Sequence, residues 1–139
     1  MSDAAFVDTN VFLYAHDDAN PLKRDRARDL IDRIMAEQTG RISLQVLQEF
    51  FANVTRKFGM DPEAARLRVA LYATIQVVPL DTIDLLAAIT FHRTYQVSIW
   101  DALILRAAEV SGCRHLYTED LQPGFRIGRL EVVNPFADL

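Results

Sequence analysis

The sequence lacks the features that mark secreted and membrane proteins. It contains one cysteine, Cys113, so no internal disulfide can form, and we expect that residue to be a small buried hydrophobic side chain. No apolar run approaches the ~20 residues that a membrane-spanning helix needs. The first apolar stretch, Ala4 to Val7, is too short for a signal peptide. We therefore expect no membrane partner and a cytoplasmic location.

Positive charge is also in short supply. The formal net charge is -4, which argues against a protein that coats nucleic acid through a broad basic surface but does not exclude a nuclease. The only lysines are Lys23 and Lys57. Both come too early for a phosphoacceptor signalling domain, which needs a lysine after a late strand. The three histidines lack the spacing of zinc ligands.

Arginine supplies nearly all of the remaining positive charge, and part of it falls in the segment KRDRARDLIDR. Here Arg24, Arg28 and Arg33 share one predicted helix. They would either follow RNA phosphates through forked hydrogen bonds or pair with the interspersed aspartates on an exposed face.

Short apolar segments alternate with helical patterns along the 139 residues. Such short, continuously apolar strands are typical of a parallel sheet covered on both faces, so we predict a single α/β domain over residues 1–139. Helix starts are marked by Asn20 before Pro21 and by the capping-box pair Asp81 and Asp84. The predicted strands are residues 5–8, 41–44, 77–80, 115–118 and 130–133; the predicted helices are residues 10–15, 21 to near 40, 45–58, 62–74, 82–95 and 99–110.

Four acidic residues interrupt apolar sequence where the chain changes direction: Asp8, Glu49, Asp101 and Asp120. Asp8 and Asp120 end two predicted strands, and open α/β sheets bind ligands outside the carboxyl ends of their strands. Asp101 shares a face with the apolar residues of its helix, so its carboxylate needs a partner. Oxygen ligands gathered from distant segments suit Mg²⁺ or Mn²⁺. The pattern therefore predicts a metal-dependent phosphodiester hydrolase.

Each acid also has an ordinary structural explanation when it is taken alone. Asp8 would cap the helix that follows it, and Asp101 stands at capping-box spacing from Ser98. Glu49 falls about 60° outside the apolar arc of its helix, which suits either a site or solvent. Asp120 would be a turn residue. Convergence of all four at one end of one sheet by accident is much less probable, so the set as a whole carries the prediction.

Four short motifs carry a family resemblance: FVDTNVFLYA, SLQVLQEFF, VSIWDALIL and LYTEDL. In order and spacing they resemble the PIN-domain ribonucleases, particularly the VapC-like toxins of bacterial type II toxin–antitoxin modules. The resemblance runs from about Phe6 to Val133. It implies a three-layer α/β/α fold with a short, mostly parallel central sheet. Position by position, the family's acidic quartet corresponds to Asp8, Glu49, Asp101 and Asp120.

Further polar residues are expected to support these carboxylates: Thr9, Asn10, Ser98, Thr118 and Glu119. Thr9 and Asn10 match the small polar residues after the first Asp, and Thr118 matches the hydroxyl residue before the last. Thr118 and Asn10 would orient the carboxylates. Glu119 departs from the family pattern by offering a fifth carboxylate, although the Thr-x-Asp spacing favours Asp120 as the last ligand.

The resemblance implies endonucleolytic cleavage of RNA that leaves a 5′-phosphate and a 3′-hydroxyl. We expect Asp8 and Asp101 to hold the principal Mg²⁺ or Mn²⁺, with Asp120 and Glu49 binding through water or holding a second ion. It also implies a homodimer and a cognate antitoxin, which can send an arginine into the acidic pocket. Two alternatives are a solitary RNA-processing nuclease and a catalytically inert interaction domain.

For several aromatic residues the sequence does not decide between a place in the core and a role in binding. Trp100, next to one of the acids, would either stack on an RNA base or be buried in the core. A surplus of aromatic side chains would form either a groove for a partner helix or extra core packing. These side chains are Phe50, Phe51, Phe58 and Tyr72.

Overall fold

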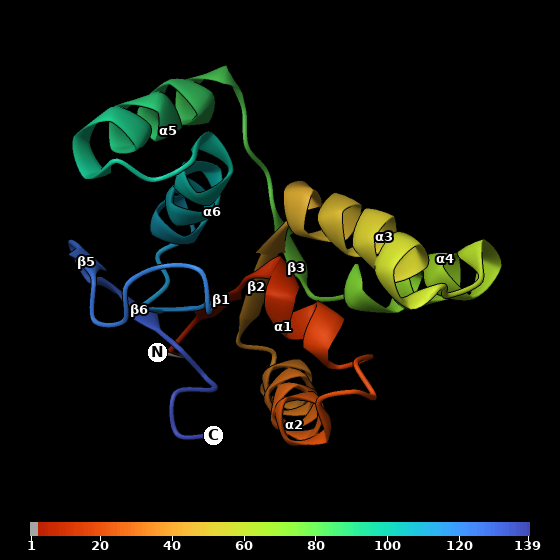
Figure 1. The fold of residues 1–139 in the computed structure, drawn as a ribbon. Coiled ribbons are helices and arrows are strands. Elements are labelled where there is room, and N and C mark those ends of the chain that lie inside the picture. Colours follow the sequence, from red (N-terminus) through yellow and green to blue (C-terminus); the bar gives the residue numbers. More distant parts are fainter. Residues whose placement is uncertain (1–2) are drawn as a thin grey trace.

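The computed structural model describes residues 3–139 and has a six-stranded sheet at its centre (Figure 1). The strand order is β3-β2-β1-β4-β6-β5. Every pairing is parallel except that of β5 with β6. The strands are β1 (Ala5–Val7), β2 (Gly40–Ser43), β3 (Gln76–Val78), β4 (His115–Tyr117), β5 (Arg126–Ile127) and β6 (Leu130–Val133).

Within the described residues, six helices flank this sheet: α1 (Thr9–Tyr14), α2 (Pro21–Glu37), α3 (Leu44–Phe58), α4 (Pro62–Tyr72), α5 (Thr82–Tyr95) and α6 (Ile99–Val110). The chain moves outward from β1 to β3 and then returns to β4, on the other side of β1. Because crossovers between parallel strands are right-handed, this reversal places the later helices on the opposite face. Figure 1 shows α5 and α6 on one side of the sheet and α2 on the other. The predicted three-layer fold is confirmed.

Apolar side chains from neighbouring strands and from both helix layers form the core. Phe6 of β1, Ile42 of β2 and Leu116 of β4 are completely buried, and so is Leu105 of α6, the helix that packs on these strands. Each such side chain contributes about 1.5–3 kcal/mol of burial free energy relative to an exposed position. The central strands and α6 are therefore the rigid frame on which the rest of the molecule is built.

An aromatic cluster extends this core beneath α3 and α4. The rings of Phe50 and Tyr72 meet edge to face with centroids 5.2 Å apart, and Phe12 lies 4.7 Å from Tyr72. Phe50 and Tyr72 are both buried, so the predicted partner groove loses two of its four members, and these two rings supply core packing. Only Phe51 and Phe58 remain substantially exposed.

Half-buried His16 belongs to the same cluster. Its Nε2 lies 3.0 Å from the Tyr72 hydroxyl. Burial, followed by the charges of Arg68 and Arg28, lowers the pKa of His16 to about 4. The imidazole is therefore neutral at neutral pH and serves the core as an uncharged hydrogen-bonding partner.

Two local predictions were wrong in detail. Asn20 occupies the N-cap position of α2, but its side chain donates to Asp17 Oδ2 (3.0 Å) and does not cap the helix. The antiparallel strand β5 was not predicted. It has only two residues, followed by Gly128 in a left-handed conformation, and two residues are too few to show the alternation of apolar and polar side chains that marks a strand. The capping box of Asp81 and Asp84 is present as predicted.

Other sequence predictions are resolved by exposure and pairing. Trp100 is 61% exposed, so it is not a core residue. Cys113 is buried, as predicted. Arg24 pairs with Asp18 and Asp25, and Arg28 donates to the Ala15 carbonyl, so these two arginines are engaged within the protein.

No helix in residues 3–139 combines the length and the apolar character that crossing a membrane requires.

Helix α5 is held to the molecule mainly through α6. Only Asp84 and Ala88 of α5 are buried. Asp84 accepts from Arg106 Nε (2.9 Å), and the same guanidinium donates to Glu109 (2.9 Å). Ile83 and Leu86 stay 70% and 60% exposed. This helix thus presents an apolar outer face, and the pair between Asp84 and Arg106 joins its inner face to α6.

We expect Arg106→Gln to loosen α5 selectively. The substitution removes the guanidinium that joins Asp84 to α6, so amides in residues 82–95 should exchange with solvent faster while β1 and β4 keep their protection. Hydrogen exchange measured by mass spectrometry checks this. Arg66→Gln, which breaks the exposed pair between Arg66 and Glu63, is the control and should leave exchange in α5 unchanged. Equal exchange of α5 in all three proteins would contradict the assignment.

Candidate acidic site at the carboxyl ends of β1 and β4

Asp8 follows β1 directly and lies beside the end of β4. The Asp8 backbone N–H donates to the Tyr117 carbonyl (3.0 Å), which extends the pairing of the two strands by one residue. This register places the Thr118 hydroxyl against Asp8 Oδ2 (2.7 Å), and both residues are buried. Asp8 also caps α1, because its Oδ1 accepts from the Thr9 N–H (2.7 Å). The predicted cap is therefore present, and it leaves the site role of Asp8 open as a prediction.

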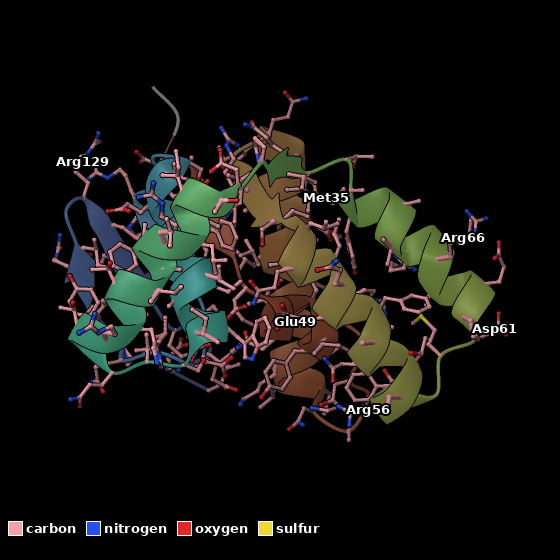
Figure 2. The ribbon with its side chains drawn as sticks, turned by 90° about the horizontal axis from the view of Figure 1, so that it is seen from above. Met35, Glu49, Arg56, Asp61, Arg66 and Arg129 are labelled. Carbon is pink, nitrogen blue, oxygen red and sulfur yellow. The ribbon has the colours of Figure 1, made fainter. Side chains whose placement is uncertain are left out.

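Glu49 projects from α3 toward the same edge of the sheet. Its Oε1 accepts from the Thr9 hydroxyl (2.7 Å), and its Oε2 lies 3.3 Å from Gln45 Nε2. Thr9 thus joins two carboxylates, through its amide to Asp8 and through its hydroxyl to Glu49. Glu49 is thus bonded within the protein beside Asp8, and its place in the middle of α3 is visible in Figure 2.

Asp101 approaches from the other helix layer, in the first turn of α6. Its N–H donates to Ser98 Oγ (3.0 Å), so Ser98 caps the helix. The return bond of a full capping box, present in α5, is not formed here by these two described residues. Half-buried Asp101 has its pKa raised by burial and then by the charges of Asp120 and Glu49. Capping is therefore the task of Ser98, and the Asp101 carboxylate stays available to the site.

The two acids after β4 point to different surroundings. The Asp120 N–H donates to Thr118 Oγ1 (3.1 Å), and its charge raises the pKa of both Asp8 and Asp101. Glu119 instead accepts from the Tyr14 hydroxyl (2.6 Å) and from Lys23 (2.5 Å). Burial raises the pKa of Glu119, but these two bonds outweigh it, and the net shift is downward. The arrangement favours Asp120 as the fourth member of the acidic cluster.

Two buried polar atoms at this edge lack a hydrogen-bond partner within the described residues: Asn10 Oδ1 and Ser43 Oγ. The Asn10 amide nitrogen lies 3.5 Å from Thr118 Oγ1. Ser43 ends β2, two residues beyond the pairing of Phe6 with Arg41, and so stands level with Asp8. Sequence reasoning missed Ser43; its only signal is a hydroxyl at the last strand position before a helix.

Gln45 is a second residue that the sequence prediction missed. Its amide nitrogen also lies 3.2 Å from the Trp100 carbonyl, so one side chain connects α3 with the start of α6. The signal was available, because Gln45 and Glu49 stand four residues apart and share a helix face.

Burial and the charges of neighbouring acids both disfavour the ionised form of Asp8. Burial is the largest cause that raises the pKa of Asp8 to about 7, hydrogen bonds from Thr118 and Thr9 oppose it, and the charges of Asp120 and Glu49 add to it. None of the ion pairs formed within residues 3–139 involves Asp8, Glu49, Asp101 or Asp120. The charges of Asp120 and Glu49 therefore act on Asp8 and Asp101 without a neutralising arginine or lysine among the described residues.

A divalent cation fits this donor set in its chemistry. Carboxylate and hydroxyl oxygens are the ligands that Mg²⁺ and Mn²⁺ prefer, and a double positive charge would relieve the repulsion. In the described part of the chain, however, no three acidic, histidine or cysteine side chains already stand in an arrangement that could hold a metal. The carboxylates are gathered at one edge but are not locked into a coordination sphere.

The family model of the PIN domain matches residues 5–126, which is most of the chain. The protein belongs to the PIN domain family. The matched residues include Asp8, Glu49, Asp101 and Asp120, so this PIN domain carries its acidic cluster within the region that defines the family. Among curated proteins, none matches the sequence significantly.

Solved structures share the fold at low sequence identity. A toxin–antitoxin complex from Klebsiella pneumoniae superposes with a TM-score of 0.70 at 19% identity, covering 96% of this chain and 98% of that one. VapC20 of Mycobacterium tuberculosis, described as a toxin that cleaves the sarcin–ricin loop, gives 0.66 at 20% identity, with 84% and 90% covered. VapBC2 of Rickettsia felis, bound to a promoter DNA fragment, gives 0.65 at 17% identity, with 93% and 96% covered.

We expect Asp8→Asn to stabilise the metal-free protein at alkaline pH. With its pKa raised from 3.8 to about 7, folded Asp8 keeps a proton that the unfolded chain releases, so stability falls as pH rises between these values. Removing the ionisable group should raise the free energy of unfolding at pH 8 by about 1–3 kcal/mol.

Urea unfolding in EDTA at pH 5 and pH 8 measures this effect. Asp29→Asn, at an exposed position on α2, is the matched control and should change stability by less than about 0.5 kcal/mol. If wild type and Asp8→Asn are equally stable at pH 8, burial and the neighbouring charges do not raise the pKa of Asp8 as described here.

Proposed function

We propose that this PIN domain is a metal-dependent endoribonuclease and the toxin of a type II toxin–antitoxin pair. The observation that carries the proposal is the acidic cluster itself. Burial and the charges of Asp120, after β4, and Glu49, on α3, raise the pKa of Asp8 at the end of β1 and of Asp101 in the first turn of α6. Perturbed groups of this kind gather at functional sites.

Asp8 and Asp101 would hold the principal Mg²⁺ or Mn²⁺, with Glu49 and Asp120 binding through water or holding a second ion. A bound divalent ion supplies charge neutralisation, a lowered pKa for water and stabilisation of phosphate oxygens. The chain's own residues fix the carboxylate orientations. Thr118 holds one oxygen of Asp8, and Thr9 links the other oxygen to Glu49. Asn10, whose Oδ1 is buried without a protein partner, has an acceptor free for a bound water.

The RNA substrate and the toxin role rest on likeness. One similar structure is described as a toxin that cleaves the sarcin–ricin loop, another is a toxin–antitoxin complex, and the third is VapBC2 bound to promoter DNA. We therefore infer a cognate antitoxin that masks the site. Exposed Leu67 and Leu71 on α4 give such a partner an apolar surface to cover. A solitary RNA-processing enzyme would have no such partner, and a short reading frame for a DNA-binding antitoxin next to the gene distinguishes the two roles.

RNA cleavage should require the divalent ion and the cluster. We expect EDTA to abolish cleavage, and Asp8→Asn or Asp101→Asn to reduce kcat/KM by at least about 100-fold with the fold intact. Glu119→Gln should stay within a few-fold of wild type, because Glu119 lies outside the acidic cluster and an amide oxygen in its place can still accept from Lys23 and Tyr14. Single-turnover assays on a labelled RNA measure this series.

Calorimetric titration with Mn²⁺ provides the companion measurement. It should show binding to wild type and to Glu119→Gln, and weakened binding to Asp101→Asn. Undiminished cleavage by both aspartate variants would refute the metal-dependent mechanism. Absence of Mn²⁺ binding by wild type would instead support an inert interaction domain.

We also propose that two copies associate through α5. Ile83, Leu85, Leu86 and Ile89 of this helix are all more than a third exposed, and a second copy would remove them from water. Leu86→Asp should convert the dimer into a monomer, measured by light scattering after size exclusion, whereas Leu67→Asp on α4 should leave the dimer intact. A wild-type monomer at high micromolar concentration would argue against this interface.

A further inference from the structure

A cleft of about 340 Å³ adjoins the acidic cluster, between α1, the last turn of α3 and the segment after β4. It shares Asn10 and Asp120 with the site described above, and its outer walls include Tyr14, Asn20, Lys57 and Phe58. This volume lies in the range of small-ligand pockets. A molecule held at the carboxylates would therefore extend directly into this cleft.

Lys57 and Phe58 give one wall of the cleft a cation next to an aromatic face. Lys57 is exposed, and it forms no ion pair or side-chain hydrogen bond with the described residues. Phe58 is 40% exposed and precedes Gly59, whose positive φ of 64° ends α3 and turns the chain away. An ammonium group and an accessible ring that line the same cleft match the phosphate and the base of a nucleotide.

The opposite wall is already ordered. Asn20 Nδ2 donates to Asp17 Oδ2 (3.0 Å), and the other oxygen of Asp17, Oδ1, accepts from the Ala19 N–H (3.1 Å). Tyr14 donates to Glu119, and Lys23 lies over the Tyr14 ring, 4.7 Å from its centroid. Lys23 thus acts behind the lining, where it neutralises Glu119, whereas Lys57 lines the cleft itself and pairs with none of the described residues.

We infer that this cleft is a subsite for one unpaired nucleotide of a single-stranded RNA, with its base stacked on Phe58 and its phosphate bound by Lys57. The inference rests on the proposed ribonuclease function. It adds the residues that would bind an RNA nucleotide next to the site of cleavage. It also explains how a protein with a net charge of -4 would hold a polyanion beside four carboxylates. A local cation and a stacking platform replace a broad basic surface, and Lys23 removes the repulsion that Glu119 would add.

RNA binding by a cleavage-deficient background tests the subsite. In Asp101→Asn protein, fluorescence anisotropy with a labelled single-stranded RNA oligonucleotide gives Kd over a range of salt concentrations. Loss of a stacking contact worth ~1–3 kcal/mol should raise Kd about 5- to 150-fold in Phe58→Ala, and Phe58→Tyr should restore binding. Lys57→Gln should reduce the slope of log K against log salt by about one phosphate contact.

The chain offers a matched control for each change. Phe51 is 39% exposed on the same helix but does not line the cleft, so Phe51→Ala should bind RNA as the background does. Arg129 is exposed in the β5–β6 turn, far from Arg56 and the end of α3 in Figure 2, so Arg129→Gln removes one positive charge without touching the cleft. Circular dichroism of all variants establishes that each is folded.

The outcomes separate this inference from the proposed function. Selective weakening by Phe58→Ala and Lys57→Gln supports the subsite. Equal Kd values for these variants and their controls overturn it, even if RNA is still bound and wild type still cleaves. If the background binds no RNA and wild type cleaves none, the ribonuclease function fails and the subsite fails with it.

Discussion

The Asp8 side chain is almost completely buried. The positions of the other site residues depend on which groups offset the desolvation cost of its carboxylate. Its backbone continues the pairing of β1 with β4, so the carboxylate cannot swing out to solvent without breaking the centre of the sheet. Hydrogen bonds from Thr9 and Thr118 offset part of the desolvation cost. The nearby charges of Glu49 and Asp120 work in the opposite direction. The balance leaves an acid whose charge state depends on what else occupies the edge.

This constraint organises both helix layers. The reversal of strand order at β1 and β4 opens a crevice that α3 borders from one face and α6 from the other. Glu49 and Asp101 are more than fifty residues apart in the sequence, and they can both meet the strand-end acids for this reason. Gln45 spans the crevice and ties the two layers together beside the cluster. The surrounding helices then differ in role: α2 and α4 complete the core, whereas α5 is mainly surface.

Sequence patterns were sufficient for the elements and for the set of acids, because both depend on local signals. Short apolar strands, proline after Asn20 and the box formed by Asp81 and Asp84 each have a local physical cause. Orientation across long separations was not available in this way. The division of labour between Glu119 and Asp120 depends on Lys23 and Tyr14, which are distant in sequence. Likewise, the burial of Phe50 and Tyr72 follows from the packing of α3 on α4. Composition alone does not indicate whether Trp100 is exposed or buried.

The contact between Lys23 and Glu119 has a thermodynamic consequence for the segment that carries Asp120. Residues 118–125 connect β4 to β5 without regular secondary structure, and such a connection ordinarily samples many backbone states. Lys23 and Tyr14 fasten Glu119, the neighbour of Asp120, to α2 and α1. The conformational entropy of this connection is therefore lost when the protein folds, before any ligand binds. An arriving ligand then meets an aspartate whose backbone is already confined, and more of its interaction energy is left to appear as affinity.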